Sequence, residues 1–372
     1  MKKTLPILFF GILFGLFFLF VFYSPDPDGG ASEKRNLAEM PSFSFGEYGV
    51  FPSAFESFVN DHFPFRSKLI RLYSLFEYKV FGEFEDSNVL VGKNDWFFYN
   101  PRTADEKNAI KDYKGVQMPD DSALEELCVE LLRFRNLLSK DGIEFVVFIS
   151  PNKANLYSEY VPEYVLRTDE RNRADVSVAY IREHTDINIM YPKAELLTGK
   201  SDAMLYYTKD DHWNEYGAWI GANVYLRNML GVEIPFPGFE FYSDTSGELA
   251  DMVNLDGQVT EANKTRFVND PLPEYTIQQN WGRWTNREYI PENGKGQKLF
   301  VIGDSFGEAF VPYLTPYYSQ ISFRRFDIDY EYSMIQSAEP DVVLLELTER
   351  FFTPDKVYDT LQTDHKREGL VY

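Results

Sequence analysis

A serine at the end of an apolar run is the first residue of this chain that could do chemistry. The run at 299–302 leads through Gly303 and Asp304 into Ser305, and 306–314 has the character of a helix. Ser305 would then lie at the carboxyl end of a buried strand and at the amino end of a helix, where its own N–H can face a developing oxyanion. The structural alternative is a helix N-cap, which Asp304 or Ser305 could equally provide.

A histidine with two preceding carboxylates could supply the base that such a serine needs. Of the four histidines, His212 alone has acidic residues both one and two positions before it, Asp211 and Asp210. In an extended segment, residues two apart point the same way, so Asp210 can reach the imidazole while Asp211 points elsewhere. Asp210 would fix the tautomer and leave the other ring nitrogen as a base for Ser305. The alternative is an aspartate that caps the following helix, beside a solvated histidine.

Other chemistries find little support in the sequence. The histidines are scattered and Cys128 is the only cysteine, so neither a metal site nor an intramolecular disulfide is expected. Phosphate-loop and dinucleotide motifs are absent, and we predict no cofactor. The net charge of −21 argues against nucleic-acid binding. Glu346 and Glu349 could be imagined as a glycosidase pair, but Glu346 is predicted at a buried strand end in a structural pair, with Arg350 as a candidate partner.

The elements that must position these residues alternate from residue 121 onward. Apolar runs predict buried strands, and segments with helical spacing separate them. This alternation predicts an α/β fold with a mostly parallel sheet covered by helices on both faces. The predicted strands are 143–149, 187–190, 298–302, 321–326 and 341–347, and the predicted helices are 121–139, 171–182, 214–230, 306–314 and 354–361. Ligands of such sheets bind at the carboxyl ends of the strands, where Ser305 would lie.

The chain before and within this catalytic domain, predicted at 121–372, is less regular. Residues 231–295 are rich in Pro, Gly and Asn and predict an irregular insertion or a few isolated strands. Residues 48–120 are predicted to be a helical and hairpin segment that packs on the core, with a helix at 66–80 and a hairpin at 89–99. The helix at 66–80 carries an apolar stripe that we expect to be core packing. The stripe consists of Leu69, Leu72, Leu75, Phe76 and Val80.

The N-terminus predicts a membrane anchor. Lys2 and Lys3 precede an apolar run from Leu5 to Tyr23, and its nineteen residues would extend over roughly 28 Å as a helix, close to the hydrocarbon thickness of a bilayer. We therefore predict a single transmembrane signal anchor at 1–23, with the lysines inside and the rest of the chain outside the cytoplasm. A cleaved signal peptide is the alternative, although no convincing cleavage site follows the run. Residues 24–47 are predicted to be a stalk.

Together, these motifs resemble the SGNH hydrolase-like proteins of bacterial polysaccharide O-acetylation. These are the alginate O-acetyltransferase group and its relatives named for an Asp-His-His-Trp motif. The resemblance covers most of the chain and rests on several short segments. They are 35–39, 60–66, 91–93, 95–98, 150–153, 210–213, 303–306 and 346–350.

The resemblance implies roles for individual residues. The family pattern is Asp-x-His-Trp, in which the first aspartate and the histidine are catalytic, and this implies Asp210 and His212, with Ser305 as the nucleophile. Asp211 departs from the histidine or threonine of the family and adds negative charge near the imidazole. His212 precedes Ser305, as in the permuted order of the O-acetyltransferase relatives. Because a triad is defined by geometry, this order costs nothing chemically.

The resemblance also implies a fold and a function. It implies an SGNH or flavodoxin-like fold, and a membrane-anchored enzyme outside the cytoplasm that O-acetylates a cell-surface or exported polysaccharide through an acyl-serine. It further implies a multi-pass membrane acyltransferase as the donor-side partner. One alternative is an acetyl esterase with the same triad, because only the acceptor would differ. A non-catalytic glycan-binding or scaffold protein is the other, but binding alone does not need Ser, His and Asp together.

Polar residues that follow two other predicted strands are candidates for the substrate or the oxyanion. Asn152 and Lys153 follow the strand at 143–149, and Arg350 follows the strand at 341–347. In a parallel sheet all of them should lie at the same edge as Ser305. Our hypothesis is that Asn152 or Lys153 helps the oxyanion hole or positions the substrate. A salt bridge that only orders the loop is the alternative.

Overall fold

The computed structural model describes two compact units. One comprises Met1–Glu85 with Ala250–Asp256, and the other comprises Asp86–Leu249 with Gly257–Tyr372. The described residues are 10–11, 14–15, 37–42, 49–63, 65–85, 87–102, 108–116, 118–270, 272, 275–279, 286–292, 294–326 and 331–361.

A seven-stranded sheet forms the centre of the larger unit, with the strand order β4-β3-β11-β9-β10-β8-β7. Five neighbouring strands, from β4 to β10, run parallel, while β8 pairs antiparallel with both β10 and β7. The prediction of a mostly parallel sheet is therefore corrected to a mixed sheet. The strands are β3 (Glu144–Ser150), β4 (Asn188–Met190), β7 (Tyr275–Gln279), β8 (Arg287–Pro291), β9 (Lys298–Gly303), β10 (Gln320–Arg325) and β11 (Val342–Thr348).

The reason for the correction lies in the stretch that we predicted to be irregular, 231–295. Two of its strands, β7 and β8, extend the main sheet as an antiparallel pair. The other two, β5 (Phe239–Asp244) and β6 (Glu261–Phe267), form a separate antiparallel ribbon. Only this ribbon matches the predicted isolated strands. A second ribbon joins β1 (Val89–Val91) to β2 (Phe97–Tyr99) with Val91 opposite Phe97, which confirms the predicted hairpin.

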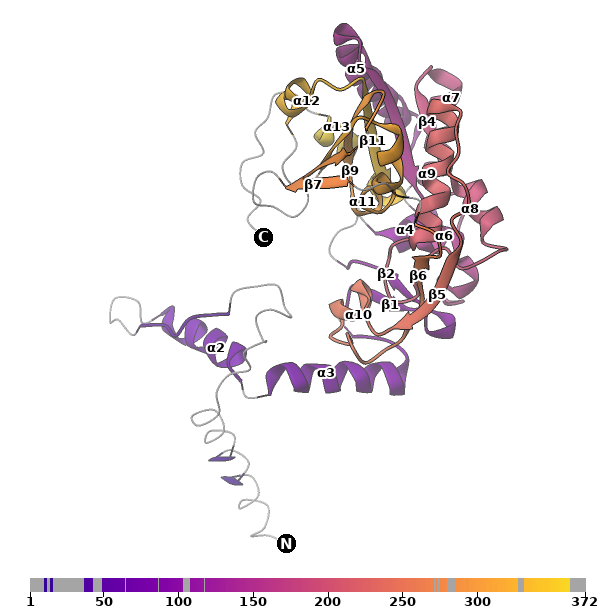
Figure 1. Ribbon diagram of the computed structural model, residues 1–372. Helices are drawn as coiled ribbons and strands as arrows, with labels where there is room; N and C mark the ends of the chain where they lie inside the picture. Colours follow the sequence, from indigo (N-terminus) through magenta and orange to yellow (C-terminus); the bar gives the residue numbers. More distant parts are fainter. Residues whose placement is uncertain are drawn as a thin grey trace. The chain divides into compact units, whose positions relative to one another are not determined.

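Helices cover both faces of the sheet, as predicted (Figure 1). Alternate residues of β3 point to opposite faces, so Val146 and Phe148 join one apolar cluster and Val147 and Ile149 the other. One cluster contains side chains from α8, α9 and α11, and the other contains side chains from α5, α7, α12 and α13. These helices are α5 (Asp121–Leu138), α7 (Arg173–His184), α8 (Lys193–Gly199), α9 (Glu215–Leu230), α11 (Ser305–Phe310), α12 (Tyr332–Ala338) and α13 (Pro354–Thr360).

Short helical segments fill the connections of the larger unit. Three are α-helical, namely α4 (Ala109–Lys114), α6 (Lys153–Leu156) and α10 (Glu248–Met252), the last of which crosses the division between the units. The 3₁₀ segments are η2 (Lys93–Asp95), η3 (Ser139–Asp141), η4 (Ser158–Tyr160), η5 (Val311–Tyr317) and η6 (Glu349–Phe351).

The smaller unit contains α2 (Phe51–Asp61) and α3 (Arg66–Phe76), and α3 continues into a π-helical turn, η1 (Glu77–Phe81). The apolar stripe on α3 was predicted to be core packing, and this is wrong. Leu69, Leu72, Phe76 and Val80 are all exposed. The predicted transmembrane segment at 1–23 lies, apart from four positions, outside the described residues. Among the residues that the structure describes, no helix has the length and apolar character to cross a membrane.

Candidate active site

Three parallel strands end at the edge of the sheet that carries the candidate site. In the shared register, Leu345 of β11 is opposite Ile302 of β9, and Thr348 of β11 is opposite Ser150 of β3. The turns that follow these strands begin at Asp304, Glu349 and Pro151 and therefore lie side by side. This edge is where ligands of open α/β sheets bind.

Ser305 is the first residue of α11, directly after the turn that leaves β9. Asp304 is the N-cap, because its Oδ1 accepts a hydrogen bond from the Phe306 N–H at 2.8 Å. Its Oδ2 accepts bonds from the N–H and the hydroxyl of Thr348, at 2.7 and 2.6 Å. Asp304 thus takes the capping role that the sequence left open between two residues. The Ser305 hydroxyl is therefore not needed as the helix cap. The backbone N–H of Ser305 lies in the first turn of α11, where N–H groups have no intrahelical acceptor.

Two glycines allow this turn to pack closely against β10 and β11. A Cβ at Gly307 would lie 2.5 Å from the Glu346 carboxylate, and a Cβ at Gly303 would lie 2.9 Å from the Phe323 ring. Glu346 is fully buried; its Oε1 accepts a 2.6 Å bond from the Ser150 hydroxyl and its Oε2 a 3.1 Å bond from the Asp304 N–H. Burial, and then the negative charge of Asp304, raise the pKa of Glu346 well above its usual range. Glu346 therefore holds the turn between β9 and α11 through the Asp304 N–H, and it does not pair with Arg350.

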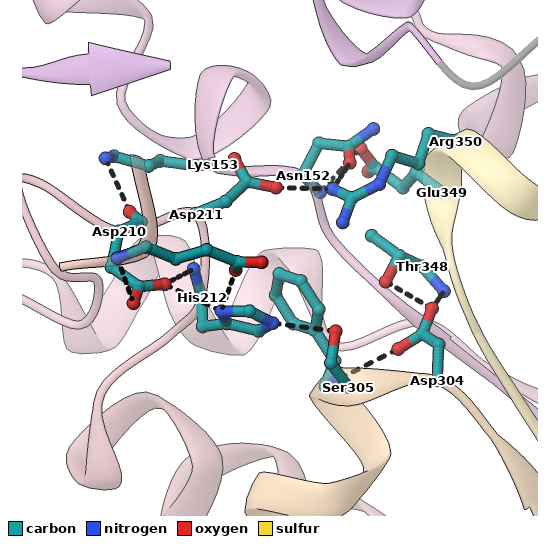
Figure 2. Close-up of polar contacts among 12 residues, drawn as sticks. Asn152, Lys153, Asp210, Asp211, His212, Asp304, Ser305, Thr348, Glu349 and Arg350 are labelled. Atoms are coloured by element: carbon teal, nitrogen blue, oxygen red, sulfur yellow. Dashed lines mark hydrogen bonds and ion pairs between the residues drawn. The ribbon is translucent and has the colours of Figure 1, made fainter. Parts of the chain in front are cut away.

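Asp210, His212 and Ser305 form a continuous hydrogen-bonded line (Figure 2). The Nε2 atom of His212 lies 2.7 Å from Ser305 Oγ, and its Nδ1 atom lies 2.7 Å from Asp210 Oδ1. The same carboxylate oxygen accepts the backbone N–H of His212 at 3.0 Å, so the i, i+2 spacing closes a local turn. With the Nδ1 proton donated to Asp210, Nε2 can accept the proton of the Ser305 hydroxyl.

The backbone around Asp210 is a tight turn held at both ends. Tyr206 and Trp213 form an antiparallel bridge, and the Tyr207 N–H donates to the His212 carbonyl at 3.2 Å. Asn214, not Asp210, caps α9: its side chain accepts bonds from the first N–H groups of that helix at 3.1 Å. The structural alternative for Asp210 is thereby excluded, and its carboxylate faces the imidazole.

Lys153 and Glu261 fix this turn from two sides. Burial lowers the pKa of Lys153 to about 8, with a partly opposing effect of Asp211. Its ammonium donates to the carbonyls of Phe97, Thr208 and Asp210, at 2.5, 3.0 and 2.9 Å, which uses all three of its donors. The buried Glu261 carboxylate accepts the N–H groups of residues 208 and 209 at 2.9 and 2.5 Å. Lys153 therefore orders the turn, and it has no donor left for an oxyanion.

Asn152, Asp211 and Arg350 form a buried polar cluster next to the triad. Arg350 Nη1 donates to Asp211 Oδ2 at 2.6 Å and to Asn152 Oδ1 at 3.2 Å, and Figure 2 shows these side chains pointing toward one another. The amide of Asn152 also donates to Asp112 at 3.1 Å, while its N–H donates to Glu349 at 2.8 Å. Asp211 thus points away from the imidazole, as expected. Asn152 is held by loop-ordering contacts, which favours that alternative for this residue.

Arg350 keeps part of its hydrogen-bonding capacity. Both described bonds are made by Nη1, and Nε is buried without a partner among the described residues. Its side chain is only 7% exposed, and its guanidinium carbon lies 5.7 Å from the centre of the Phe306 ring. Phe306 directly follows Ser305, and its ring centre is 5.0 Å from that of His212. Arg350 is therefore a predicted substrate residue that keeps donor capacity beside the Phe306 ring, next to Ser305 in the chain.

Charge around the imidazole favours its protonated form. Burial alone would lower the pKa of His212, but the hydrogen bond and charge of Asp210, followed by the charges of Glu248 and Asp211, raise it to about 9. Burial would raise the pKa of Asp210, but bonds to His212 and to the Glu248 N–H, with the charge of His212, bring it well below its usual range. At neutral pH these shifts favour the carboxylate form of Asp210 and the imidazolium form of His212.

Glu248 is a third acidic residue at this site, which sequence reasoning missed. Its Oε2 lies 3.5 Å from Nδ1 of His212, and its N–H donates to Asp210 Oδ2 at 3.0 Å. The approach is close because Gly247 precedes it, where a Cβ would lie 2.6 Å from the Lys209 carbonyl. Glu248 lies 36 positions after His212, inside the stretch predicted to be irregular, so no local spacing could indicate it.

Asp210, His212 and Glu248 also have the atom types of a metal site. One ligand-type atom from each lies within 4.8 Å of the others. However, Nδ1 of His212 and Asp210 Oδ1 already share a 2.7 Å bond. A cation there would compete with the bond that orients the imidazole. The arrangement is therefore better suited to acid–base chemistry than to metal binding.

Comparison with known proteins decides the family. The model of the family described as "SGNH hydrolase-like domain, acetyltransferase AlgX" matches residues 89–321. The chain belongs to this family. The matched region includes Asp210, His212 and Ser305, and it leaves out α2, α3 and η1 of the smaller unit.

Curated relatives are distant but consistent with this family. A probable alginate O-acetylase AlgJ of Azotobacter vinelandii is 23% identical over 266 residues, which are 69% of this chain and 63% of the relative. Its counterpart in Pseudomonas aeruginosa is 24% identical over 298 residues, which are 75% of this chain and 68% of the relative. The match thus spans a little under two thirds of the first relative.

Solved structures share the fold. A DHHW family protein of Eubacterium siraeum superposes with a TM-score of 0.52 at 15% identity, over 74% of this chain and 98% of that protein. PatB1 of Bacillus cereus, solved with a sulfonyl adduct, gives a TM-score of 0.51 at 16% identity, over 72% of this chain and 98% of that protein. At such identities the likeness shows a shared fold, and the family match identifies this α/β fold as SGNH-like.

Proposed function

We propose that this chain is a membrane-anchored O-acetyltransferase that works outside the cytoplasm on a cell-surface or exported polysaccharide. The observation that carries the proposal is the hydrogen-bonded line from Asp210 through His212 to Ser305, with both links at 2.7 Å. Membership of the acetyltransferase family supports the acyl chemistry, and the names of the curated relatives support a polysaccharide acceptor. The apolar run at 5–23 supports the anchor.

The first half of the reaction makes an acyl-serine. His212 Nε2 takes the proton of the Ser305 hydroxyl while Oγ attacks the carbonyl carbon of an acetyl ester. The carbonyl oxygen becomes an oxyanion, which the Ser305 N–H and the remaining donors of Arg350 can stabilise. Collapse of this intermediate breaks the ester bond, and the departing alcohol of the donor takes the proton from Nε2.

The second half repeats these steps with a different alcohol. A sugar hydroxyl gives its proton to Nε2 and attacks the acetyl carbonyl, after which Ser305 Oγ leaves and recovers the proton. Asp210 keeps the ring oriented throughout and stabilises the imidazolium. A multi-pass membrane acyltransferase is the proposed donor-side partner, since an anchored domain meets such a partner at high effective concentration.

An acyl-transfer assay tests the proposal directly. The purified full chain in detergent receives p-nitrophenyl acetate as donor and alginate oligosaccharides as acceptors, and mass spectrometry of the sugar is compared with released acetate. We expect acetylated sugar to form at the expense of free acetate as the acceptor concentration rises. Free acetate as the sole product, whatever the acceptor concentration, would instead make the protein an esterase toward this donor.

Glu248→Gln is expected to move the acidic limb of the pH–rate profile to lower pH. The base must be neutral, and the pKa of His212 is about 9, so kcat/KM of the native protein should rise as the pH approaches that value. Glu248 stabilises the imidazolium, so removing its charge lowers this pKa and increases the rate at neutral pH by roughly three- to tenfold. Ester hydrolysis measured across the pH range checks this, with Glu183→Gln on the exposed side of α7 as the matched control. A limb that stays in place would show that Glu248 does not tune the base.

A further inference from the structure

The helix α3 and the turn η1 expose an apolar stripe on the surface of the smaller unit. Its members recur three to four residues apart, which places them on one side of the helix. The exposed fraction is 63% at Leu72 and 59% at Val80. The exposed side chains on this side of the helix are those of four residues of the predicted stripe and of Tyr73, namely Leu69, Leu72, Tyr73, Phe76 and Val80.

The same helix packs with polar residues on its inner side. Ser74 and Glu77 are buried, at 8% and 7% exposure, together with Tyr78. The Glu77 carboxylate has an internal partner, because its Oε1 accepts the Glu85 N–H at 3.1 Å. The buried carboxylate thus has a hydrogen-bond partner, and the apolar side of the helix faces outward. Exposed apolar stripes of this kind mark contacts with another protein or with a membrane.

The charges beside the stripe favour a membrane. Residues 66–81 contain four Lys or Arg residues and a single acidic residue, the buried Glu77, in a chain of net charge −21. Lys68, Arg71 and Lys79 are exposed. An apolar stripe flanked by cations is typical of helices that lie in the interface of an anionic bilayer. A second copy of this acidic chain would also complement these cations and cover the apolar side, but the predicted membrane anchor on the same chain favours the bilayer.

The position of the stripe along the chain supports the same partner. The apolar run that ends at Tyr23 lies 43 positions before Arg66, so the proposed anchor keeps α3 within reach of the bilayer surface. The family match begins only at residue 89, so α3 and η1 precede the region that defines the acetyltransferase family. The helix α3 and the turn η1 can therefore have a role other than the acyl chemistry.

We propose that α3 and η1 form an interfacial helix whose apolar stripe enters an anionic bilayer surface. Tyr73 and Phe76 would lie at the headgroup level, where aromatic side chains favour the interface. Lys68, Arg71 and Lys79 would contact lipid phosphates. The proposal goes beyond the acyltransferase function and does not depend on it, although it uses the proposed anchor to bring the helix to the membrane.

Spin labelling of the full chain tests this proposal. Cys128 is replaced by alanine, and a nitroxide is attached to a single cysteine introduced by Leu72→Cys or Phe76→Cys, in vesicles of phosphatidylglycerol and phosphatidylcholine. We expect oxygen to relax these labels more than a polar nickel chelate does. Arg71→Cys on the same helix and Glu183→Cys in the other unit serve as controls, which should favour the chelate. Phe14→Cys reports separately on the anchor.

Each outcome decides the matter. Labels at 72 and 76 that stay open to the chelate, while the label at 14 is protected, would overturn the interfacial helix and leave the anchor intact. Labels at 72 and 76 that neither reagent reaches would show that protein covers the stripe, which also overturns the proposal. The double variant Leu72→Glu with Phe76→Glu should remove the oxygen-dominated signal from a label at 69, while hydrolysis of a soluble acetyl ester stays unchanged.

Discussion

Ser305→Ala is expected to lower kcat/KM for acetyl transfer by about 10⁴-fold or more, because no acyl-enzyme can form without the attacking oxygen. The fold should tolerate the change. Asp304 supplies the N-cap of α11, and the described polar contact of the Ser305 hydroxyl is the one to His212. Initial rates of donor consumption and of sugar acetylation measure the loss, and thermal unfolding checks that the variant is folded.

A matched serine variant separates the nucleophile from general effects. Ser201→Ala removes an exposed hydroxyl whose bonds, within the described part of the chain, go to neighbouring residues of its own turn, and it should leave the rates unchanged. A sulfonyl fluoride should add its sulfonyl group to the peptide that contains Ser305 in the native protein and not in Ser305→Ala. Sugar acetylation that survives Ser305→Ala at near-native rate would remove the acyl-serine from the mechanism.

The positions of the three triad residues could be predicted because each depends on local structure. Asp210 and His212 are two residues apart, and one short turn is enough to bring carboxylate and imidazole together. Ser305 follows a buried apolar run, and such a run before a Gly-Asp-Ser turn indicates a strand end. Local sequence patterns cannot predict the 2.7 Å contact between His212 and Ser305, because these residues are 93 positions apart. The pairing was predicted from the complementary chemistry of serine and histidine, and the family resemblance implied the same roles.

The residues that support the triad could not be predicted, because they come from distant segments. Glu248 and Glu261 reach the Asp210 turn from the stretch predicted to be irregular, and nothing in their local spacing distinguishes them from acids expected at the surface. Lys153 illustrates the opposite error. A lysine beside an active site suggests an anion, but burial against three carbonyls gives it a structural role.

The errors in the fold have a similar cause. The three central parallel strands, β3, β9 and β11, are largely continuous apolar runs, since helices cover both of their faces, and such runs are easily recognised. The antiparallel strands β7 and β8 lie at the end of the sheet and contain more polar residues, so they were assigned to an irregular stretch. Periodicity on α3 correctly indicated one apolar face. However, it cannot say whether that face meets a core or the outside of the protein, and here it is exposed.

Asp210→Asn should lower kcat by about 10³- to 10⁴-fold while leaving more activity than Ser305→Ala. Asparagine can keep one oxygen for either His212 or the Glu248 N–H, but its NH₂ group cannot accept the other bond. An NH₂ group facing Nδ1 would favour the tautomer with the proton on Nε2, and that tautomer cannot accept the serine proton. The loss of negative charge also lowers the pKa of His212, so the residual rate should reach its plateau at a lower pH than the native rate.

Glu248 can limit this loss, because its carboxylate lies 3.5 Å from Nδ1 of His212. If Glu248 partly replaces Asp210 as the orienting group, the double variant Asp210→Asn with Glu248→Gln should be slower at its pH plateau than Asp210→Asn alone. Glu248→Gln in the native background should then alter the pH profile and leave the plateau nearly unchanged. This difference separates orientation of the ring from stabilisation of its charge, since stabilisation alone would shift the profile and leave both plateaus alike. A plateau for Asp210→Asn at the native level would show that Asp210 does not orient the base.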